Sequence, residues 1–296
     1  MSEKKDYNGV ETTGHEWDGI EELNNPLPRW WVWVFYATIV WGIGYTIAYP
    51  AWPGIKNSTA GLLGFSTRAN VAADIAAVNE QNAALVAELA SADLVALVDN
   101  RDSELYSYAV NGGRAIFAAN CSQCHGSGAN GVAEGNGYPN LRDDAWLWGG
   151  TVDEIAFTVS HGIRNEQSLD ARWSEMPAFG EILPQEEVEQ VVQYVLSLSG
   201  NETDAALVEA GAEVYDINCS ACHGVEGLGD TFQGAPNLTD AIWLYGGDVE
   251  SVTETVMNSR FGVMPAWSQD FNEAFGLTAD EVNAVAVYVH QLGGGQ

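Results

Sequence analysis

An uncharged apolar run near the N-terminus is the strongest hydrophobic pattern in the chain. Residues 30–55 contain no Asp, Glu, Lys, Arg or His, and their apolar core has about the 20 residues that cross a hydrocarbon layer as a helix. Pro28 precedes the run and Pro50 ends its core. Aromatic residues gather at both ends, as in the interfacial belts of a membrane span: Trp30, Trp31, Trp33, Tyr45, Tyr49 and Trp52. The pattern predicts one transmembrane helix over residues 30–52.

Helical periodicity continues beyond this run. Over residues 69–99, apolar side chains recur at helical spacing in an Ala-rich background: Val71, Ile75, Val78, Leu85 and Leu89. This predicts one or two helices, which act either as a spacer or as a docking surface for another subunit. The second interpretation is favoured, because a spacer needs no apolar stripe. Further stripes over residues 152–160, 188–195 and 282–289 predict that the rest of the chain is helical as well.

An internal repeat occupies the C-terminal part of the chain. Two copies of about 90 residues indicate a duplicated domain, with residues 197–203 as the linker. The first copy has a longer stretch before its Met-Pro pair, so the two copies are not expected to be equivalent. The matched segments are 113–121 with 211–219, 139–141 with 236–238, 146–150 with 243–247, 176–177 with 264–265, and 186–194 with 280–288.

The chain is strongly acidic, with a net charge of −30 and no lysine after Lys56. Residues 201–296 hold 15 acidic side chains and one basic one, Arg260. This argues against a nucleic-acid partner, because phosphate contacts need Lys and Arg. Two interpretations of the acidity stay open: it steers a cationic redox partner, or it only keeps the domain soluble.

All four cysteines lie in two copies of the motif C-x-x-C-H, at residues 121–125 and 219–223. The motif is the attachment signature of a c-type haem, whose vinyl groups react with the two thiols. A thioredoxin-like pair or two disulfides need no following histidine, and a four-cysteine zinc site usually has closer spacing. The motifs therefore predict two covalently attached haem c groups and a carrier of single electrons. The predicted attachment residues are Cys121, Cys124, Cys219 and Cys222.

Each motif also supplies one axial iron ligand, His125 or His223. The other ring nitrogen of such a histidine needs an acceptor that fixes its tautomer and orientation. In class I cytochromes c, which the repeats resemble, a downstream proline carbonyl accepts this hydrogen bond. Pro139 and Pro236 occupy that position in the two repeats.

The predicted sixth ligands are Met176 and Met264, each in a Met-Pro pair before the closing helix of its repeat. Ligation by Met and His raises the reduction potential relative to ligation by two histidines. Each Met is able to bind the iron of its own repeat or that of the other, and local pairing is the default. The competing residues are assigned to core or surface roles: Met257, His161 and His290.

Two further groups of residues are candidate haem contacts. Arg164 and Arg260 precede the Met-Pro pairs, and a guanidinium group suits a haem propionate. Three tryptophans are able to pack against the haem or to donate an indole N–H to a propionate: Trp146, Trp148 and Trp243. Ordinary packing is the alternative role for both groups.

The order of these features resembles one known family. The chain resembles the dihaem subunit III (FixP/CcoP type) of cbb3-type cytochrome c oxidases. The features that carry this resemblance are a single anchor, an Ala-rich helical segment, two haem c repeats and the phrases WLWGG, PNL and YVLSLSG. The likeness covers roughly residues 20–290. It implies an all-α chain, in which one N-terminal transmembrane helix precedes two tandem class I cytochrome c domains.

The resemblance implies a function as well. A soluble or anchored cytochrome c would reduce these haems, and electrons would pass to the monohaem subunit and then to the catalytic subunit, where oxygen is reduced. The chain itself would be a non-catalytic relay. Two alternatives stay open: a free membrane-anchored dihaem carrier similar to cytochrome c4, and a dihaem peroxidase. A peroxidase needs an open sixth iron position, whereas this chain offers a Met-Pro pair at both sites.

Haem c is attached outside the bacterial cytoplasm, so the haem domains are expected in the periplasm, anchored to the inner membrane by a single pass. The flanking charges, Arg29 and Lys56, hardly set the orientation. The acidic leader is expected to be disordered or dependent on a partner. The predicted segments are a cytoplasmic leader (1–29), the anchor (30–52), a linker with the helical docking segment (53–110), and two cytochrome c domains (111–200 and 201–296).

Overall fold

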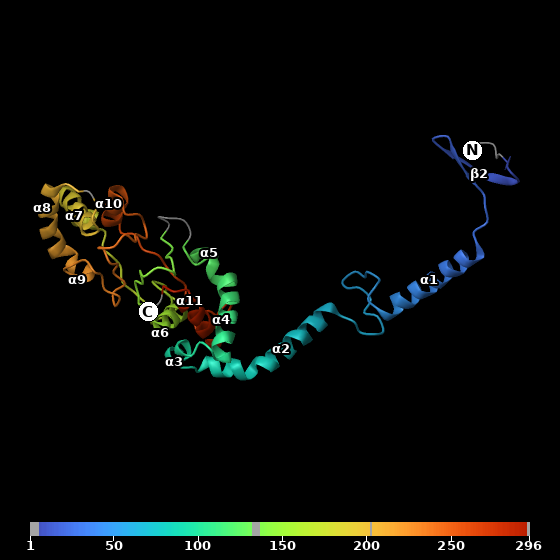
Figure 1. Cartoon of the computed structure of the whole chain (residues 1–296), viewed down its shortest axis with the longest axis horizontal. Coiled ribbons are helices and arrows are strands. Elements are labelled where there is room, and N and C mark those ends of the chain that lie inside the picture. Colours follow the sequence, from blue (N-terminus) through green and yellow to red (C-terminus); the bar gives the residue numbers. More distant parts are fainter. Residues whose placement is uncertain (1–5, 132–136, 202, 295–296) are drawn as a thin grey trace. The chain divides into compact units, whose positions relative to one another are not determined.

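The computed structural model describes residues 6–131, 137–201 and 203–294 (Figure 1). The chain divides into two compact units, residues 1–81 and 82–296. Most of the described residues that have regular structure are helical, and the exception is a small sheet in the first unit. The prediction of a mostly helical chain is confirmed.

The leader forms a three-stranded antiparallel sheet, so the expectation of disorder is wrong. Its strands are β1 (Asp6–Tyr7), β2 (Val10–Trp17) and β3 (Ile20–Leu23), in the order β1-β2-β3. Both connections are two-residue turns, Asn8-Gly9 and Asp18-Gly19, with positive φ at every position. Asn-Gly and Asp-Gly favour the type I′ turn that joins antiparallel strands, and this local preference outweighs the polar composition of the segment.

Helix α1 (Arg29–Ala48) covers the uncharged apolar run. It has 20 residues and a mean hydropathy of 1.4, and none of its side chains is buried. Among the described residues it is the one helix long and apolar enough to cross a membrane. At its C-terminal end Tyr45 stacks on Tyr49, with ring centroids 4.8 Å apart. An apolar helix that buries nothing within the chain is what the predicted anchor requires.

The helical segment predicted over residues 69–99 consists of two helices, α2 (Thr67–Ala90) and α3 (Leu94–Asp99). Leu89 is the one buried residue of α2, and its carbonyl accepts a hydrogen bond from Asn283 Nδ2 at 2.9 Å. This hydrogen bond ties the C-terminal end of α2 to the helix that contains Asn283, within the second unit. The apolar residues nearer the N-terminus of α2 are exposed: Val71, Ile75 and Val78.

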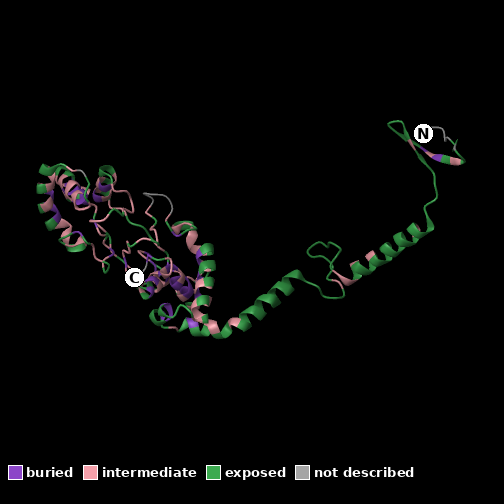
Figure 2. Cartoon of the chain, in the orientation of Figure 1, coloured by how far each residue is buried: buried purple, intermediate pink, exposed green. Residues whose placement is uncertain are grey.

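The second unit contains the internal repeat, whose helices alternate with glycine-rich loops. The apolar stripes predicted over residues 152–160, 188–195 and 282–289 are the buried faces of three of its helices; buried residues are purple in Figure 2. The periodicity predictions are therefore confirmed. Its remaining helices are α4 (Glu104–Ile116), η1 (Phe117–Cys121), α5 (Ser122–His125), α6 (Val152–His161), η2 (Phe179–Glu181), α7 (Gln185–Leu198), α8 (Ala205–Asn218), α9 (Ser220–His223), α10 (Val249–Asn258) and α11 (Ala279–His290).

The packing of these helices does not follow the order of the repeats. Helix α4, which begins the first repeat, packs against α11, which ends the second. Helix α8, which begins the second repeat, packs against α7, which ends the first. Helices α3, α4, α6 and α11 form the first core, and α7, α8 and α10 form the second core. Each core therefore combines the CxxCH half of one repeat with the closing helix of the other.

Glycine allows both helix crossings to be close. A Cβ atom at Gly113 of α4 would lie 2.1 Å from the carbonyl oxygen of Ala284 in α11. A Cβ atom at Gly211 of α8 would lie 2.1 Å from the carbonyl oxygen of Gln190 in α7. Gly113 and Gly211 are equivalent in the repeat, so the same close crossing occurs twice, each time with the helix of the other repeat.

Candidate functional site

The two CxxCH motifs occupy equivalent helix ends. Cys121 ends η1 and α5 carries Cys124 and His125, while α9 follows directly after Cys219. All four thiols are free, and burial raises the pKa of Cys121 and Cys219 to about 11, so both are protonated at neutral pH. In the part of the chain that the structure describes, no three His, Cys, Asp or Glu side chains gather as a metal site.

A proline carbonyl orients each CxxCH histidine. Nδ1 of His125 lies 3.2 Å from the carbonyl oxygen of Pro139, and Nδ1 of His223 lies 3.1 Å from that of Pro236. Because a carbonyl only accepts, Nδ1 carries the proton and donates it, which leaves the Nε2 lone pair for a metal. Burial lowers the pKa of both histidines, against the opposing effect of the proline hydrogen bond. Both rings are therefore neutral at neutral pH, which is the form that binds a metal.

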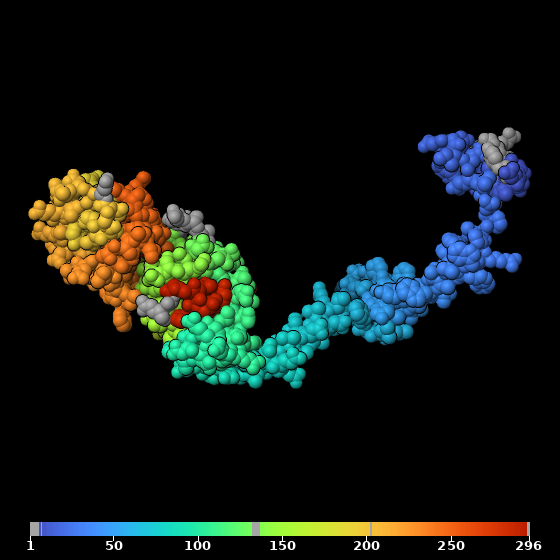
Figure 3. Space-filling view, in the orientation of Figure 1, coloured from blue at the N-terminus to red at the C-terminus, as the bar shows by residue number. Residues whose placement is uncertain are grey.

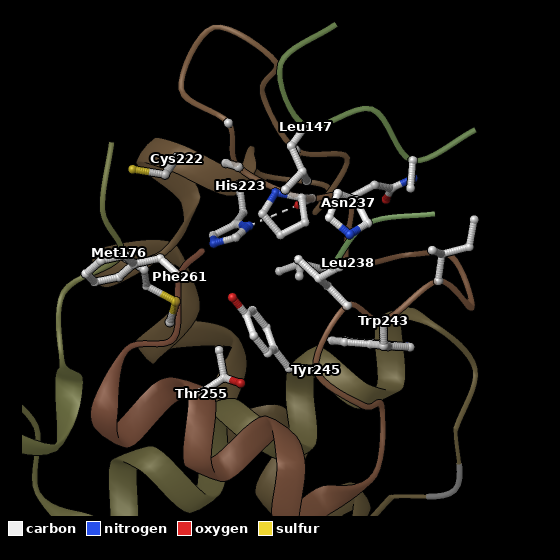
Figure 4. Close-up of a pocket in the computed structure, with 18 of the residues that line it drawn as sticks. Leu147, Met176, Cys222, His223, Asn237, Leu238, Trp243, Tyr245, Thr255 and Phe261 are labelled. Atoms are coloured by element: carbon white, nitrogen blue, oxygen red, sulfur yellow. Dashed lines mark hydrogen bonds between the residues drawn. The ribbon is translucent and has the colours of Figure 1, made fainter. Parts of the chain in front are cut away.

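A cavity of about 1270 Å³ lies beside His223 (Figure 4). Met176 and His223 both line it, and Figure 4 shows the Met176 sulfur and the imidazole ring turned toward the same space. Met176 reaches this cavity from the first repeat, whereas His223 belongs to the second. The rest of the lining is largely apolar and aromatic and includes Leu238, Trp243, Tyr245 and Phe261.

Met264 lies at the first core. It is partly buried and packs against that core, as do Cys121 and Trp146 of the first repeat. Its backbone forms two hydrogen bonds with Ile163, from Ile163 N to Met264 O at 2.9 Å and from Met264 N to Ile163 O at 3.0 Å. The structure thus brings each Met to the core that holds the CxxCH motif of the other repeat. Which iron each Met binds stays a prediction, but each Met-Pro loop lies with the core of the other repeat because its closing helix is exchanged.

Side chains of the opposite repeat also hold the two Met carbonyls. Ser259 Oγ of the second repeat donates to the carbonyl of Met176, and Asn165 Nδ2 of the first repeat donates to the carbonyl of Met264 at 3.0 Å. Ser259 adopts a left-handed φ of 58°, which a non-glycine residue rarely takes. These bonds fix the backbone from which each thioether projects.

We expect Asn165→Ala to lower the free energy of unfolding by about 2 kcal/mol. Asn165 is 9% exposed, and its amide donates to the carbonyls of His161 and Met264 and accepts from the backbone N–H of Gln167. Truncation leaves these buried groups without their partner. Chemical denaturation of the haem-loaded protein measures the change, with the exposed Asn201→Ala as the control. Equal stability of the two variants would show that Asn165 does not secure the exchanged loop.

Arg164 lines the cavity and joins the two Met-Pro loops. Its Nε donates to the carbonyl of Ser174 at 2.6 Å and its Nη1 to that of Gly262 at 3.0 Å. The guanidinium group lies 5.5 Å from the ring centroid of Phe261 and 5.9 Å from that of Trp148. Burial lowers the pKa of Arg164, but an arginine stays charged at neutral pH. The predicted contact with a haem propionate stays a prediction.

Arg260 occupies the corresponding place in the second repeat. Its guanidinium group lies 4.8 Å from the ring centroid of Tyr245 and donates to the carbonyl of Ser251 and the hydroxyl of Thr255, both at 2.6 Å. Arg260 also lines the cavity. Both candidate arginines are thus fixed by backbone or hydroxyl groups and by an aromatic ring.

The candidate tryptophans have different surroundings. Trp146 and Trp243 line the cavity, but Trp146 Nε1 already donates to the carbonyl of Asp143 at 3.0 Å. For Trp146 this favours packing against the haem over donation of its indole N–H to a propionate. Trp148 is 7% exposed and packs so closely on Gly234 that a Cβ there would lie 2.3 Å from its ring.

Three residues of the site were not among the sequence candidates: Tyr245, Asn165 and Ser259. Tyr245 was detectable, because it occupies in WLYGG the place of Trp148 in WLWGG. Figure 4 shows its hydroxyl directed into the cavity. The contacts of Asn165 with Met264 and of Ser259 with Met176 span 99 and 83 residues along the chain. No local pattern in the sequence predicts such contacts.

Three family models match this chain. One described as the N-terminal domain of cytochrome oxidase-cbb3, FixP, matches residues 9–56. One described as cytochrome c oxidase, cbb3-type, subunit III matches residues 109–195, and one described as cytochrome c matches residues 208–293. The two cytochrome c matches coincide with the two repeats.

Curated relatives resemble the chain over nearly its whole length. It is 56% identical to the cbb3-type cytochrome c oxidase subunit CcoP of Cereibacter sphaeroides, over 96% of this chain and 95% of the relative. It is 47% identical to the FixP subunit of Sinorhizobium medicae, over 98% and 97% of the two chains. It is 49% identical to the CcoP subunit of Rhodobacter capsulatus, over 97% of both. The resemblance found in the sequence motifs is confirmed.

Proposed function

Since this chain belongs to the cbb3-type cytochrome c oxidase subunit III family, the FixP and CcoP proteins, we propose that each CxxCH motif attaches one haem c and that each iron takes its sixth ligand from the other repeat. The chain is a dihaem cytochrome c subunit that transfers electrons, with two cytochrome c domains that bind haem c. The observation that carries the ligand assignment is the cavity lined by both His223 and Met176.

The residues around this cavity suit a haem. Cys219 caps the N-terminus of α9, which carries Cys222 and His223, and attachment through two thioethers requires this proximity. His223 is neutral, with Nδ1–H donated to Pro236 and Nε2 left as a ligand. Leu238, Trp243 and other largely apolar groups limit the access of water. When bound, the haem supplies an iron that takes up and releases one electron.

By the same reasoning Met264 is the sixth ligand at the first site, with His125 as the fifth. Its position in the core that holds Cys121 and Trp146 supports this assignment. Hydrogen bonds from Asn165 and Ile163 hold its carbonyl oxygen and so fix the loop. The exchanged Met loops make the two sites parts of one structure, so the distance between the two irons does not depend on a flexible linker. That suits successive steps of an electron relay.

We further propose where the subunit works and what it contacts. The one candidate span among the described residues supports a membrane anchor. Because haem c is attached outside the bacterial cytoplasm, the proposal is an inner-membrane anchor with the leader in the cytoplasm and the haem domains in the periplasm. Electrons would come from a periplasmic or anchored cytochrome c and continue through the monohaem subunit to the catalytic subunit. The names of the relatives place them in an oxidase complex and thereby support these partners.

Purification in a mild detergent tests this function. We expect the chain to be recovered together with a haem b and copper subunit, and its own two haems to be low-spin and inactive toward peroxide. Recovery of the chain alone, from membranes that retain oxidase activity, would favour a free dihaem carrier. A high-spin haem that turns over peroxide would favour a peroxidase instead.

A further inference from the structure

Four large apolar side chains are exposed around the second CxxCH motif. Their exposed fractions are 71% for Ile217, 72% for Val225, 60% for Leu228 and 93% for Phe232. Solvent-exposed apolar residues that gather in one place mark interaction surfaces more often than single ones do. In Figure 3 the orange segment that contains them lies at the surface of the second unit.

Hydrogen bonds hold these residues in one place around α9. Tyr215 donates its hydroxyl to the carbonyl of Gly224 at 2.7 Å, and Gly229 N donates to the carbonyl of His223 at 2.8 Å. Gln233 Nε2 donates to the carbonyl of Ala221 at 3.4 Å, which brings the segment of Phe232 back onto α9. Leu228, Phe232 and Cys222 are exposed and also line the cavity, so they lie at its mouth. These four residues, Ile217, Val225, Leu228 and Phe232, are called the second-site patch, and two of them, Leu228 and Phe232, lie with Cys222 at the mouth of the cavity where the haem would be attached.

The first site has the same loop but not the patch. Gly131 N donates to the carbonyl of His125 at 2.9 Å, as Gly229 N does to His223, so the loop backbones correspond. The residues that correspond to three members of the patch are small or polar: Ala119, Ser127 and Asn130 replace Ile217, Val225 and Leu228. Because the loop backbone does not require apolar side chains there, their presence at the second site needs another reason.

Acidic side chains flank the residues of the second-site patch along the chain. Those nearest in the chain are Glu213, Asp216, Glu226 and Asp230, and no Lys or Arg occurs between residues 201 and 259. Asp230 accepts hydrogen bonds from Phe232 N and Gln233 Nε2, and these lower its pKa, so it stays ionised at neutral pH. An apolar centre inside an acidic rim is complementary to a partner with an apolar centre inside a basic rim.

We propose that the second-site patch is the docking site of a small lysine-rich c-type cytochrome, which makes the second repeat the first to be reduced. This rests on the proposed function, since it requires haem at the second CxxCH motif. One electron leaves the ferrous iron of the donor, which becomes ferric, and the ferric iron held at His223 becomes ferrous. No bond is made or broken and no proton moves. The apolar centre shortens the distance between the two haem edges, while the acidic rim raises the association rate.

Binding between oxidised proteins tests the docking site without electron transfer. Calorimetry would measure the affinity of the full haem-loaded chain for a lysine-rich mitochondrial-type cytochrome c, both ferric. The test variant Val225→Ser/Leu228→Asn installs the residues of the first repeat, which that loop backbone already accommodates. We expect the affinity to fall about tenfold, because central apolar contacts carry most of an interface's binding energy. Leu169→Asn, which changes a leucine that is 104% exposed outside the patch, is the matched control and should leave the affinity unchanged.

A second variant separates charge from apolar contact. Asp216→Asn/Glu226→Gln should slow association and flatten its dependence on salt, whereas Val225→Ser/Leu228→Asn should keep that dependence. An unchanged affinity in both double variants would overturn the docking site. A second result would also overturn it: a Val225→Ser/Leu228→Asn chain that binds the cytochrome normally but no longer assembles with the oxidase. That result would mean that another subunit covers the patch. Haem content and reduction by ascorbate report separately on the proposed function, because they depend on the haem sites and not on docking.

Discussion

Met176→His is expected to lower the reduction potential of the haem at the second CxxCH motif, and not that of the first. A thioether stabilises ferrous iron relative to a second imidazole, so the shift should be on the order of 0.1 V, within the about 0.8 V range that axial ligands cover. The weak sulfur–iron absorption band of that haem should disappear as well. The reason is structural: Met176 belongs to the first repeat but lines the cavity of His223.

A chain that carries one haem makes the result decisive. In a Cys121→Ala/Cys124→Ala background the second haem alone can be attached, so every spectral change belongs to it. Adding Met176→His should then abolish the sulfur–iron band, and adding Met264→His should leave it unchanged. Redox titration and absorption spectra would record both properties. The reverse outcome would mean that each Met binds the iron of its own repeat.

Gly113→Ala is expected to lower the stability of the second unit by about 2 kcal/mol or more, a large effect for one methyl group. The added Cβ would lie 2.1 Å from the Ala284 carbonyl oxygen and 2.7 Å from the Tyr288 Cβ, and α4 and α11 would have to separate. Backbone at a helix crossing cannot move aside as a flexible side chain does. Thermal unfolding of the haem-loaded protein would measure the loss.

The neighbouring glycine provides a matched control in the same helix. A Cβ at Gly112 meets nothing within 4 Å, so Gly112→Ala should raise stability by about 0.5–1 kcal/mol through helix propensity alone. Opposite signs for the two substitutions are therefore expected. If both variants were stabilised equally, the close crossing of α4 and α11 would be disproved. Gly211→Ala should repeat the loss at the crossing of α8 and α7, where the Cβ would meet Gln190.

Much of this protein was predictable from local patterns. The apolar run became α1, the valine stripes became buried helix faces, and the CxxCH motifs and Pro139 and Pro236 lie where their chemistry requires. Each of these features depends on interactions within a few turns of helix or within one loop. Such local interactions produce a regular periodicity or motif in the sequence. The leader is ordered despite its polar composition, because two short turn signals, Asn8-Gly9 and Asp18-Gly19, favour antiparallel strand pairing.

The sequence by itself determined which groups are available: an anchor, two haem attachment motifs, two oriented histidines and two methionines. Only the tertiary structure decided that Met176 lines the cavity of His223 and that Met264 packs against the core of the first motif. The closing helices α7 and α11 carry similar valine stripes, so either could pack on α4 or α8 by apolar pattern alone. The choice depends on contacts that span nearly a whole repeat, such as Asn165 with Met264 and Gly113 with Ala284. Such contacts form only when distant segments meet. They therefore leave no periodicity or fixed spacing in the sequence from which they could be predicted.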